Sequence, residues 1–344
     1  MRSGSSTSRV RSSTVDPPQV TRRPPTIAVV HTRESPCRCH AAFLRALRAL
    51  GLRGLEVCVE ELPAARAAIA AADLVLEHAE SFHGRGDLRP LVRHTIEAWG
   101  GRLAGSPAAA AQAADDKIEA SRRLAAARLS VPRSATVRSP AGARAAAGAL
   151  GLPVVLKRPF EHGSRGVVRC DTTAGAGTRA RRWLRRGDDE LLVEEMVPGR
   201  ELAAAVIEAR GVTRVLPIVE VRLADGALYT EGIKWAAGPL PIAPARLPAR
   251  VRREVETAAR RAFRALGLRD YARFDLRLPP GGRPCFLEAN ARPSVEPGTE
   301  LRLAAQLAGL SFPRLLAAIL AGAARRHGDA RLAGRIETAG RAVR

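Results

Sequence analysis

The residues with the clearest chemical potential lie in the stretch 271–299, which reads YARFDLRLPPGGRPCFLEANARPSVEPGT. Apolar residues alternate with charged ones, and a Pro-Pro-Gly-Gly turn separates two short runs, so the stretch predicts an antiparallel hairpin. If the turn centres on the two glycines, Asp275 lies opposite Glu288 and Arg273 lies opposite Asn290. Two facing carboxylates repel each other unless a proton or a cation lies between them. Together with the amide oxygen of Asn290 they form a set of hard ligands that suits Mg²⁺.

A solvated hairpin face with scattered charges is the alternative interpretation of this stretch. Rare residue types elsewhere in the chain favour the metal site. Only three of the 56 basic residues are lysines, Lys117, Lys157 and Lys234, and Asn290 is the single asparagine. Because lysine and arginine are not interchangeable at a phosphate, a lysine in so arginine-rich a chain indicates a chemical requirement.

A glycine-rich loop follows one of these lysines. The expected strand PVVLK at 153–157 ends in Lys157, and FEHGSRG at 160–166 leads into a second short strand. The backbone N–H groups of such a loop can bind phosphate. An ordinary hairpin has the same pattern, and the lysine at the base of the loop favours the phosphate site.

The apolar periodicity of the chain predicts the strands and helices that position these residues. Strands expected at 26–30, 55–59 and 73–76 alternate with helices, which predicts a small parallel α/β unit. Loops at the carboxyl ends of such strands bind ligands, so His83 in the loop SFHGRG is a candidate substrate contact, although a structural role fits it equally well. Further along, Asp115 is expected to cap a helix, and the runs 216–223 and 227–233 predict a hairpin.

Composition narrows the classes of function. The formal net charge of +22 points to polyanions, but the arginines are spread over the whole chain without interleaved aromatic residues for base stacking. We therefore expect no specific nucleic-acid binding. No apolar run reaches the roughly 18 residues of a membrane helix, and the N-terminus lacks the apolar core of a secretory signal. The five cysteines show no disulfide framework, so we expect a cytoplasmic protein without membrane attachment.

The ordered motifs of the chain resemble the ATP-grasp superfamily and, within it, the D-alanine–D-alanine ligase-like carboxylate–amine ligases. The resemblance runs from about residue 26 to residue 324, and all three lysines lie inside its motifs. These motifs, in order, are DDK, VVLKRP with EHGSRGV, VEEMVPGREL, LPIVEV with GIKW, YARFDL with FLEANARP, and AGLSFPRLL. The resemblance implies an ATP-grasp fold of the α/β (α+β) class, with a small N-terminal parallel α/β domain and two α+β subdomains that clamp ATP.

The motifs divide the chain into five expected parts. A disordered basic tail is expected at 1–25, an N-terminal substrate domain at 26–113 and a central lid subdomain at 114–195. A catalytic subdomain is expected at 196–326, and a flexible tail at 327–344.

The resemblance also assigns site residues. The residues implied to bind ATP are Lys117, Lys157, Gly163, Ser164, Glu194, Glu195, Val197, Glu201 and Lys234. The residues implied to hold Mg²⁺ or Mn²⁺ are Asp275, Glu288 and Asn290. The implied catalytic residues are Arg273, Lys234 and Ser294, and Thr299 matches the position that contacts the carboxylate of the second substrate.

Departures from the family pattern concentrate in the half of the site that binds amino acids. The family's glutamate-containing segment after the first strand is missing, and the chain reads VHTRES there. Gly163 and Trp235 stand where the family has a serine and a tyrosine, and Ser294 replaces the glycine of the oxyanion hole. The nucleotide half is therefore expected to be intact, while D-alanine specificity is open.

The sequence thus predicts an ATP- and Mg²⁺-dependent carboxylate–amine ligase that acts on small amino acids or peptides through an acyl phosphate. It does not give the oligomeric state; a homodimer is an expectation from the resemblance alone, because dimers are common among such ligases. One alternative is a genuine D-alanine–D-alanine ligase of peptidoglycan synthesis. Another is an ATP-binding protein without catalysis, associated with nucleic acid through its charge.

Overall fold

The N-terminal part of the chain forms a parallel sheet. The computed structural model describes residues 23–33, 38–224, 226–234 and 240–343. Its first sheet has the strand order β2-β1-β3-β4 with all pairs parallel. The elements are β1 (Thr26–His31), α1 (Cys39–Ala49), β2 (Arg53–Cys58), α2 (Leu62–Ala71), β3 (Leu74–Glu77), α3 (Arg89–Ala98) and β4 (Leu103–Ala104). The apolar runs of β1 and β3 are buried on both faces, as strands covered by helices on two sides must be.

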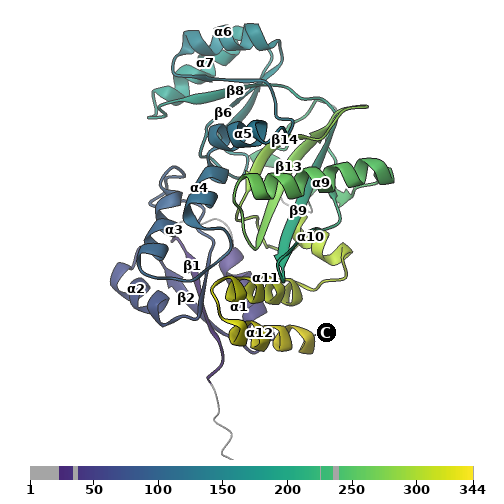
Figure 1. Ribbon diagram of the computed structural model, residues 1–344. Coiled ribbons are helices and arrows are strands. Elements are labelled where there is room, and N and C mark those ends of the chain that lie inside the picture. The colour runs from purple at the N-terminus through teal and green to yellow at the C-terminus, as the bar shows by residue number, and fades with distance from the viewer. Residues whose placement is uncertain (1–22, 34–37, 225, 235–239, 344) are drawn as a thin grey trace, which may run out of the picture.

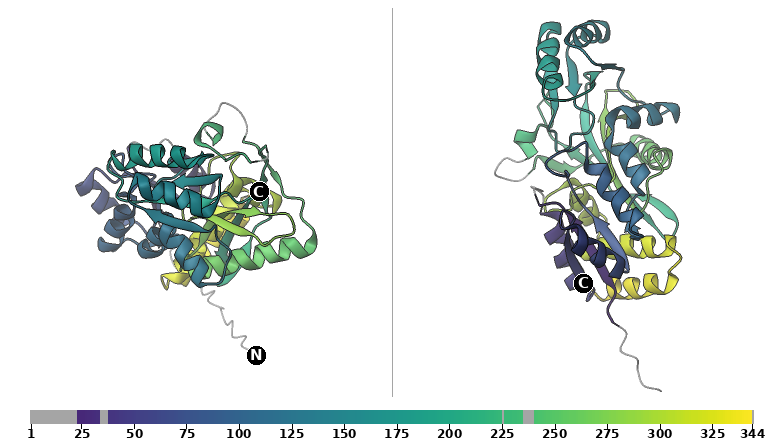
Figure 2. Two further views of the ribbon diagram at one scale, coloured as in Figure 1. Left: turned by 90° about the horizontal axis from the view of Figure 1, so that it is seen from above. Right: turned by 90° about the vertical axis from the view of Figure 1, so that its left-hand side faces the viewer.

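Two antiparallel sheets follow (Figure 1). The central sheet has the order β5-β8-β6-β7 and is covered by α6 and α7. Its elements, with the two helices that lead to it, are α4 (Ala108–Asp115), α5 (Lys117–Ala126), β5 (Ser134–Val137), α6 (Pro140–Leu150), β6 (Val154–Lys157), β7 (Val167–Cys170), α7 (Thr173–Leu184) and β8 (Leu191–Glu195). In the right-hand view of Figure 2 this subdomain lies at the top, at the opposite end of the molecule from the N-terminal domain.

The third sheet has the order β12-β11-β9-β13-β14, and β10 pairs with β9 outside this path. Its elements are β9 (Arg200–Ala209), β10 (Val212–Val215), β11 (Val219–Val221), α8 (Glu231–Lys234), β12 (Ile242–Pro244), α9 (Ala249–Ala265), β13 (Tyr271–Leu278) and β14 (Cys285–Asn290). Helix α9 packs its buried face, with Val255 and Phe263, on this sheet. The mixture of one parallel and two antiparallel sheets confirms the predicted fold class.

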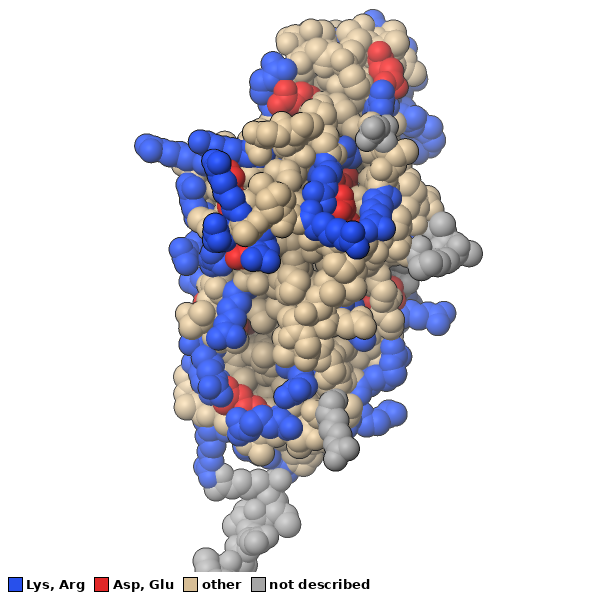
Figure 3. Space-filling model, turned by 90° about the vertical axis from the view of Figure 1, so that its right-hand side faces the viewer, with Lys and Arg blue, Asp and Glu red and all other residues tan. Residues whose placement is uncertain are grey.

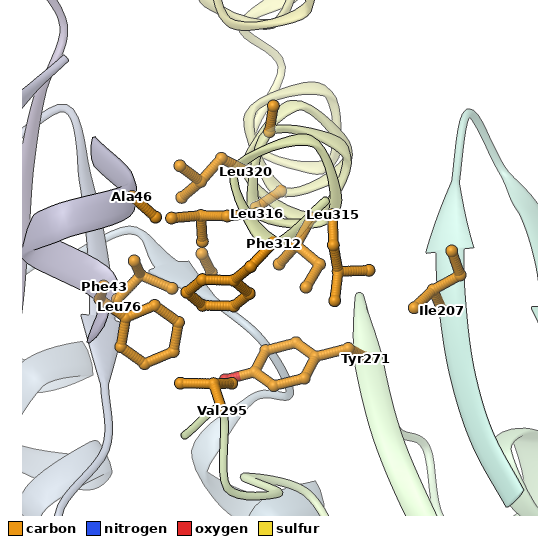
Figure 4. Packing of buried hydrophobic residues seen from close by; sticks show 14 of the residues in the cluster. Phe43, Ala46, Leu76, Ile207, Tyr271, Val295, Phe312, Leu315, Leu316 and Leu320 are labelled. Carbon is orange, nitrogen blue, oxygen red and sulfur yellow. The ribbon is translucent and has the colours of Figure 1, made fainter. Parts of the chain in front are cut away.

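Helix α11 (Phe312–Arg326) joins the first and third sheets. Its buried residues belong to one core with Phe43 of α1, Leu76 of β3 and Ile207 of β9. Figure 4 shows Phe312, Leu315 and Leu316 pointing into the space between these elements. This shared core fixes the N-terminal domain against the C-terminal sheet. It therefore also fixes the loops of the first sheet relative to the loops of the third sheet.

The end of the chain corrects one prediction. Residues 327–344 were expected to be a flexible tail, but α12 (Ala330–Ala342) packs along α11, with Leu332, Ala333 and Ile336 buried. Asp329 caps this helix by accepting a hydrogen bond from the backbone N–H of Leu332 at 2.8 Å. The many arginines of the segment obscured its apolar face, which recurs every three to four residues.

A second prediction is wrong at 227–233. The expected hairpin partner is not a strand there, because residues 231–234 form α8 and β11 pairs instead with β12. Residues 1–22, within the expected N-terminal tail, and Trp235 lie outside the described residues.

The surface charge concerns the expectation about nucleic acid, and the helices concern the expectation about membranes. On the face in Figure 3, basic side chains are spread along the whole molecule, and acidic side chains lie beside several of them. In the described part of the chain, no single helix is long and apolar enough to cross a membrane. Helices α10 (Glu300–Leu307) and α11 reach that length and hydropathy only when taken together, and the pair is bent by 96°.

Candidate active site

Two cavities adjoin each other between the sheets. The smaller, of about 70 Å³, is lined by Lys157, Ser164, Glu194, Glu195, Met196, Val197, Glu201, Asp275, Arg277 and Leu287, among others. The larger, of about 310 Å³, is lined by His78, Glu80, Arg89, His162, Gly163, Arg273, Asn290, Arg292, Ser294, Glu296, Thr299 and Glu300, among others. Tyr229, Lys234 and Glu288 line both cavities and therefore mark their junction.

The hairpin has the predicted register at its polar residues. Asp275 pairs with Glu288 and Arg273 with Asn290 across β13 and β14. The ladder slips by one residue between Asp275 and Leu276, which leaves Leu287 as an extra residue in β14. Such a bulge re-aims the chain, and the carbonyl of Leu287 accepts a hydrogen bond from Lys157 Nζ at 3.3 Å.

Arg273 links the hairpin to α10. Its guanidinium donates two hydrogen bonds to Asp275, at 2.8 and 3.0 Å, and one to Glu300 at 3.0 Å. Although burial opposes the charge, Asp275 and Glu300 raise the pKa of Arg273 above its ordinary value. Arg273 is therefore a fixed cation in the wall of the larger cavity, held in one orientation by bidentate geometry.

Glu288 lies close to one lysine ammonium and to the buried imidazole of His162, whose pKa burial lowers to about 4. Lys117 Nζ and His162 Nδ1 are each 3.9 Å from its Oε1. Burial alone would raise its pKa, but Lys117, His162 and Lys234 hold the pKa of Glu288 well below its usual range. The ionised carboxylate therefore keeps lone pairs available at the junction.

The predicted metal trio fits a hard cation by its donor chemistry. Asp275 and Glu288 supply carboxylate oxygens, and Asn290 Oδ1 accepts one hydrogen bond, from the Arg292 backbone at 2.9 Å, with a second lone pair left. Among the described residues no group of three His, Cys, Asp or Glu side chains could hold a metal. The trio combines two carboxylates with an amide, so it is not such a group, and oxygen donors of this kind suit Mg²⁺.

Lys157 and Glu194 form a buried ion pair in the smaller cavity. Lys157 Nζ lies 2.5 Å from Glu194 Oε2, and both side chains are less than one-tenth exposed. Glu195 and Val197 follow on the same segment and also line this cavity. Glu201, another carboxylate of this cavity, accepts hydrogen bonds from Arg277 through Oε2 only, at 2.8 and 3.1 Å.

Lys117 lies behind the glycine-rich loop. Its ammonium donates to the carbonyls of Pro159 and Glu161, and it lines neither of the two cavities. Asp116 caps α5 through the backbone N–H groups of Ile118 and Glu119, so the prediction that Asp115 is the cap is wrong. Lys117 therefore holds the glycine-rich loop by these hydrogen bonds and places a positive charge near Glu288.

The glycine-rich loop covers the junction. Gly163, Ser164 and Gly166 have φ values of 66°, 64° and 64°, so this turn uses the left-handed region three times. Ser164 Oγ donates to the carbonyl of Tyr229 at 2.5 Å, which ties the loop to the segment before α8. Lys234, the last residue of α8, has its Nζ 4.6 Å from the centre of the Tyr229 ring.

The amino-acid half of the site differs from its prediction. Ser294 and Thr299 line the larger cavity, and Thr299 Oγ1 lies 2.8 Å from the carbonyl of Glu296 and 3.1 Å from that of Ser294. His83 is exposed, packs at a tilt against the Phe82 ring and lines neither cavity, so the structure does not support it as a substrate contact. His78 and Glu80, from the same segment, line the cavity instead.

A buried ionic network forms the floor beneath these residues. Glu77 lies 2.5 Å from Arg93 Nε and 2.8 Å from Arg292 Nη1, and Arg292 also pairs with Asp115. Burial would raise the pKa of Glu77, but Arg292 and Arg93 lower it to about 2. Sequence reasoning missed these residues because acids and arginines far apart in the chain carry no local pattern.

Comparisons with known proteins show the family to which the chain belongs. A family model described as D-ala D-ala ligase C-terminus matches residues 128–321. A D-alanine–D-alanine ligase of Desulforudis audaxviator is 36% identical over 239 residues, which cover 69% of this chain and 77% of that protein. One of Bordetella petrii is 31% identical over 249 residues, covering 71% and 74%. The chain belongs to the D-alanine–D-alanine ligase family.

Solved structures of this family share the fold. A D-alanine–D-alanine ligase from Bacillus anthracis complexed with ATP has a TM-score of 0.73 at 19% identity and covers 90% of this chain and 99% of its own. The VanG D-Ala:D-Ser ligase from Enterococcus faecalis has a TM-score of 0.68 at 18% identity, covering 88% and 100%. The predicted family, the ATP-grasp fold and the class of C–N bond-forming ligase are confirmed.

Proposed function

We propose that this protein is an ATP- and Mg²⁺-dependent carboxylate–amine ligase that joins two small amino acids, or an amino acid and a small peptide, through an acyl phosphate. The single observation that carries the proposal is the junction of the two cavities. Lys234 and Glu288 line both, so a phosphate group in the smaller cavity and a carboxylate in the larger one would meet there.

The chemistry needs a cation-rich place for the migrating phosphoryl group. A carboxylate is a poor electrophile, and phosphorylation by ATP gives it a leaving group. Bound Mg²⁺ would neutralise charge on the phosphates, and Asp275, Glu288 and Asn290 are the residues that would hold it. Lys234 and Arg273 add fixed positive charge on the side of the larger cavity, where charge develops during acyl transfer.

The smaller cavity is proposed to bind the nucleotide. Lys157 is oriented by Glu194 and by the Leu287 carbonyl, so its ammonium is a fixed cation beside the cavity. Glu201 keeps its Oε1 clear of Arg277, and that oxygen is available to ribose hydroxyl donors.

The glycine-rich loop is proposed to exclude water from the reacting groups. An acyl phosphate is hydrolysed when water reaches it, so a closed lid protects the intermediate. The hydrogen bond from Ser164 to the Tyr229 carbonyl supports a closed position of this loop over the junction.

A phosphate-release screen tests the proposal. Purified protein with ATP and Mg²⁺ is incubated with single and paired D- and L-amino acids and dipeptides, with D-alanine included because the relatives carry that name. We expect ADP and phosphate only with a suitable amino acid. If no substrate stimulates ADP formation across the panel, the ligase proposal is wrong and a binding protein without catalysis is favoured.

A further inference from the structure

The three lysines of the site are held in different ways. Lys117 donates hydrogen bonds to two backbone carbonyls, and Lys157 pairs with Glu194 and donates to another carbonyl. Within the described residues, Lys234 Nζ forms neither a hydrogen bond nor an ion pair. Its ammonium lies instead over the ring of Tyr229, 4.6 Å from the ring centre. Lys234 therefore has an aromatic face where the other two lysines have oxygen acceptors.

Helix α8 does not fix this lysine by its own packing. The helix has four residues, none of which is buried, and Lys234 is the last of them. A single helical turn has little stability of its own. Tyr229, in contrast, is 8% exposed and lies at the junction of the two cavities. Its carbonyl accepts the hydrogen bond from Ser164 Oγ, so the tyrosine is held against the glycine-rich loop.

The ring face is what Tyr229 offers to its neighbours. Burial, and after it the negative charge of Glu300, raise the pKa of Tyr229 above its ordinary value, so the phenol stays protonated. In the part of the chain that the structure describes, the hydroxyl has no hydrogen-bond partner. The contact with Lys234 therefore depends on the aromatic ring and not on the hydroxyl group.

We propose that Tyr229 is a positioning residue, whose ring holds the ammonium of Lys234 at the junction of the cavities for the transferred phosphoryl group. An aromatic face attracts a cation through its quadrupole. A carboxylate partner would instead occupy N–H donors of the ammonium and neutralise its charge. The ring does neither, so the charge and the donors stay available to phosphate oxygens. This inference rests on the proposed ligase function, in which Lys234 meets the migrating phosphoryl group.

Two carboxylates compete for the same ammonium. Burial would raise the pKa of Glu300, but Arg273 and then Lys234 lower it, so the lysine lies within electrostatic reach of this carboxylate. Lys234 also contributes to the lowered pKa of Glu288, after Lys117 and His162. Among the described residues neither carboxylate forms an ion pair with Lys234. Without the ring, the ammonium would be free to pair with either one, and its charge would be lost to the phosphate.

The test uses nucleotide affinity, which needs no turnover. Calorimetry measures the affinities of a non-hydrolysable ATP analogue and of ADP, both with Mg²⁺, for the full-length wild type, Tyr229→Leu and Tyr229→Phe. The ratio of the two affinities isolates the contact with the third phosphate. Lys234→Met, alone and combined with Tyr229→Leu, completes a double-mutant cycle.

Two additions make the comparison specific. Trp99→Leu is the matched control, because Trp99 is a partly buried aromatic residue of the N-terminal domain that lines neither cavity. The Tm of each variant reports folding, and Tyr229→Met is a second variant without a ring if leucine unfolds the protein.

The expected result depends on the ring and on the lysine together. Tyr229→Leu should lower the affinity ratio, and kcat with the best substrate, by about tenfold, or about 1.4 kcal/mol, as loss of a cation–π contact out of water predicts. Tyr229→Phe should stay within about twofold of wild type, because phenylalanine also attracts a cation. Once Lys234 is methionine, Tyr229→Leu should have no further effect on the ratio. Trp99→Leu should behave as wild type.

Three results would overturn the inference. One is an affinity ratio that the ringless variants leave unchanged. Another is an equal loss from Tyr229→Leu when Lys234 is already methionine, because the ring would then act by another route. The third is a Tyr229→Phe variant as impaired as Tyr229→Leu, since the hydroxyl would then carry the effect. Failure of the ligase function looks different: the ratio would still depend on Tyr229 and Lys234 while no amino acid stimulates ADP formation.

Discussion

Replacing Glu288 by glutamine should abolish turnover and leave the fold in place. Glu288 lines both cavities, lies opposite Asp275 and is one of the three proposed metal ligands. Glutamine keeps the shape of the side chain and one oxygen donor but removes the charge that binds a divalent cation. Loss of a group outside the ligand shell of a metal typically costs about 10–100-fold, so loss of a ligand charge should cost at least about a hundredfold in kcat.

The effect on stability should be small because two electrostatic terms nearly cancel. Attraction between Glu288 and Lys117, 3.9 Å apart, is worth about 4 kcal/mol at an effective dielectric constant of about 20. Glu288 and Asp275 are directly opposite each other, with Cβ atoms roughly 5 Å apart, and if their charges lie at a similar separation their repulsion is worth about 3 kcal/mol on the same scale. Removing both leaves a loss of about 1 kcal/mol, which should lower Tm by roughly 2–4 °C at most.

The assay measures both quantities on the same preparation. Phosphate release is followed at saturating ATP with the best substrate of the screen, over a range of Mg²⁺ concentrations, and Tm is measured without Mg²⁺. Glu254→Gln on α9 serves as the control for the substitution itself. Turnover within threefold of wild type would refute the metal assignment. A drop in Tm of more than about 10 °C would refute the cancellation argument.

Three further predictions follow from the buried groups. Lys157→Met should raise the KM for ATP and cost roughly 3–5 kcal/mol of stability, because it leaves Glu194 buried and unpaired. The double variant Lys157→Met with Glu194→Gln should recover the stability but not the KM. Urea denaturation measures the stability, and ATP kinetics measure the KM. Burial lowers the pKa of His78 to about 4 from an ordinary 6.5, so between these pH values the unfolded state binds more protons than the folded state. Stability should therefore fall as the pH drops from about 6.5 to about 4. The decline of Tm with falling pH should be shallower in His78→Gln, and the same decline in variant and wild type would contradict this prediction. Ile336→Ala should cost about 2–4 kcal/mol because this side chain is buried under α11, whereas the exposed Arg341→Ala should change stability by less than about 0.5 kcal/mol in the same denaturation experiment.

Local patterns carried the predictions that succeeded. Alternation of apolar residues and a two-glycine turn set the pairing of Asp275 with Glu288, because register between adjacent strands depends on the turn and on a period of two. The bulge at Leu287 escaped this reasoning, since nothing in the residue types marks the extra position. The helix at 330–342 escaped it as well, because its arginines gave the segment the composition of a solvated tail.

By itself the sequence determined the family of the protein, and it predicted the residues that line the smaller cavity. The hairpin, the glycine-rich loop and the rare lysines are each visible in a short stretch of sequence, and the order of these motifs along the chain indicates the family. Only the tertiary structure decided the lining of the larger cavity. His78 and Glu80 come from the first sheet, while Arg292 and Glu296 follow the last strand of the third. They share one cavity because the core around α11 packs the two sheets together, and a contact between segments about 215 residues apart leaves no periodic signal in either.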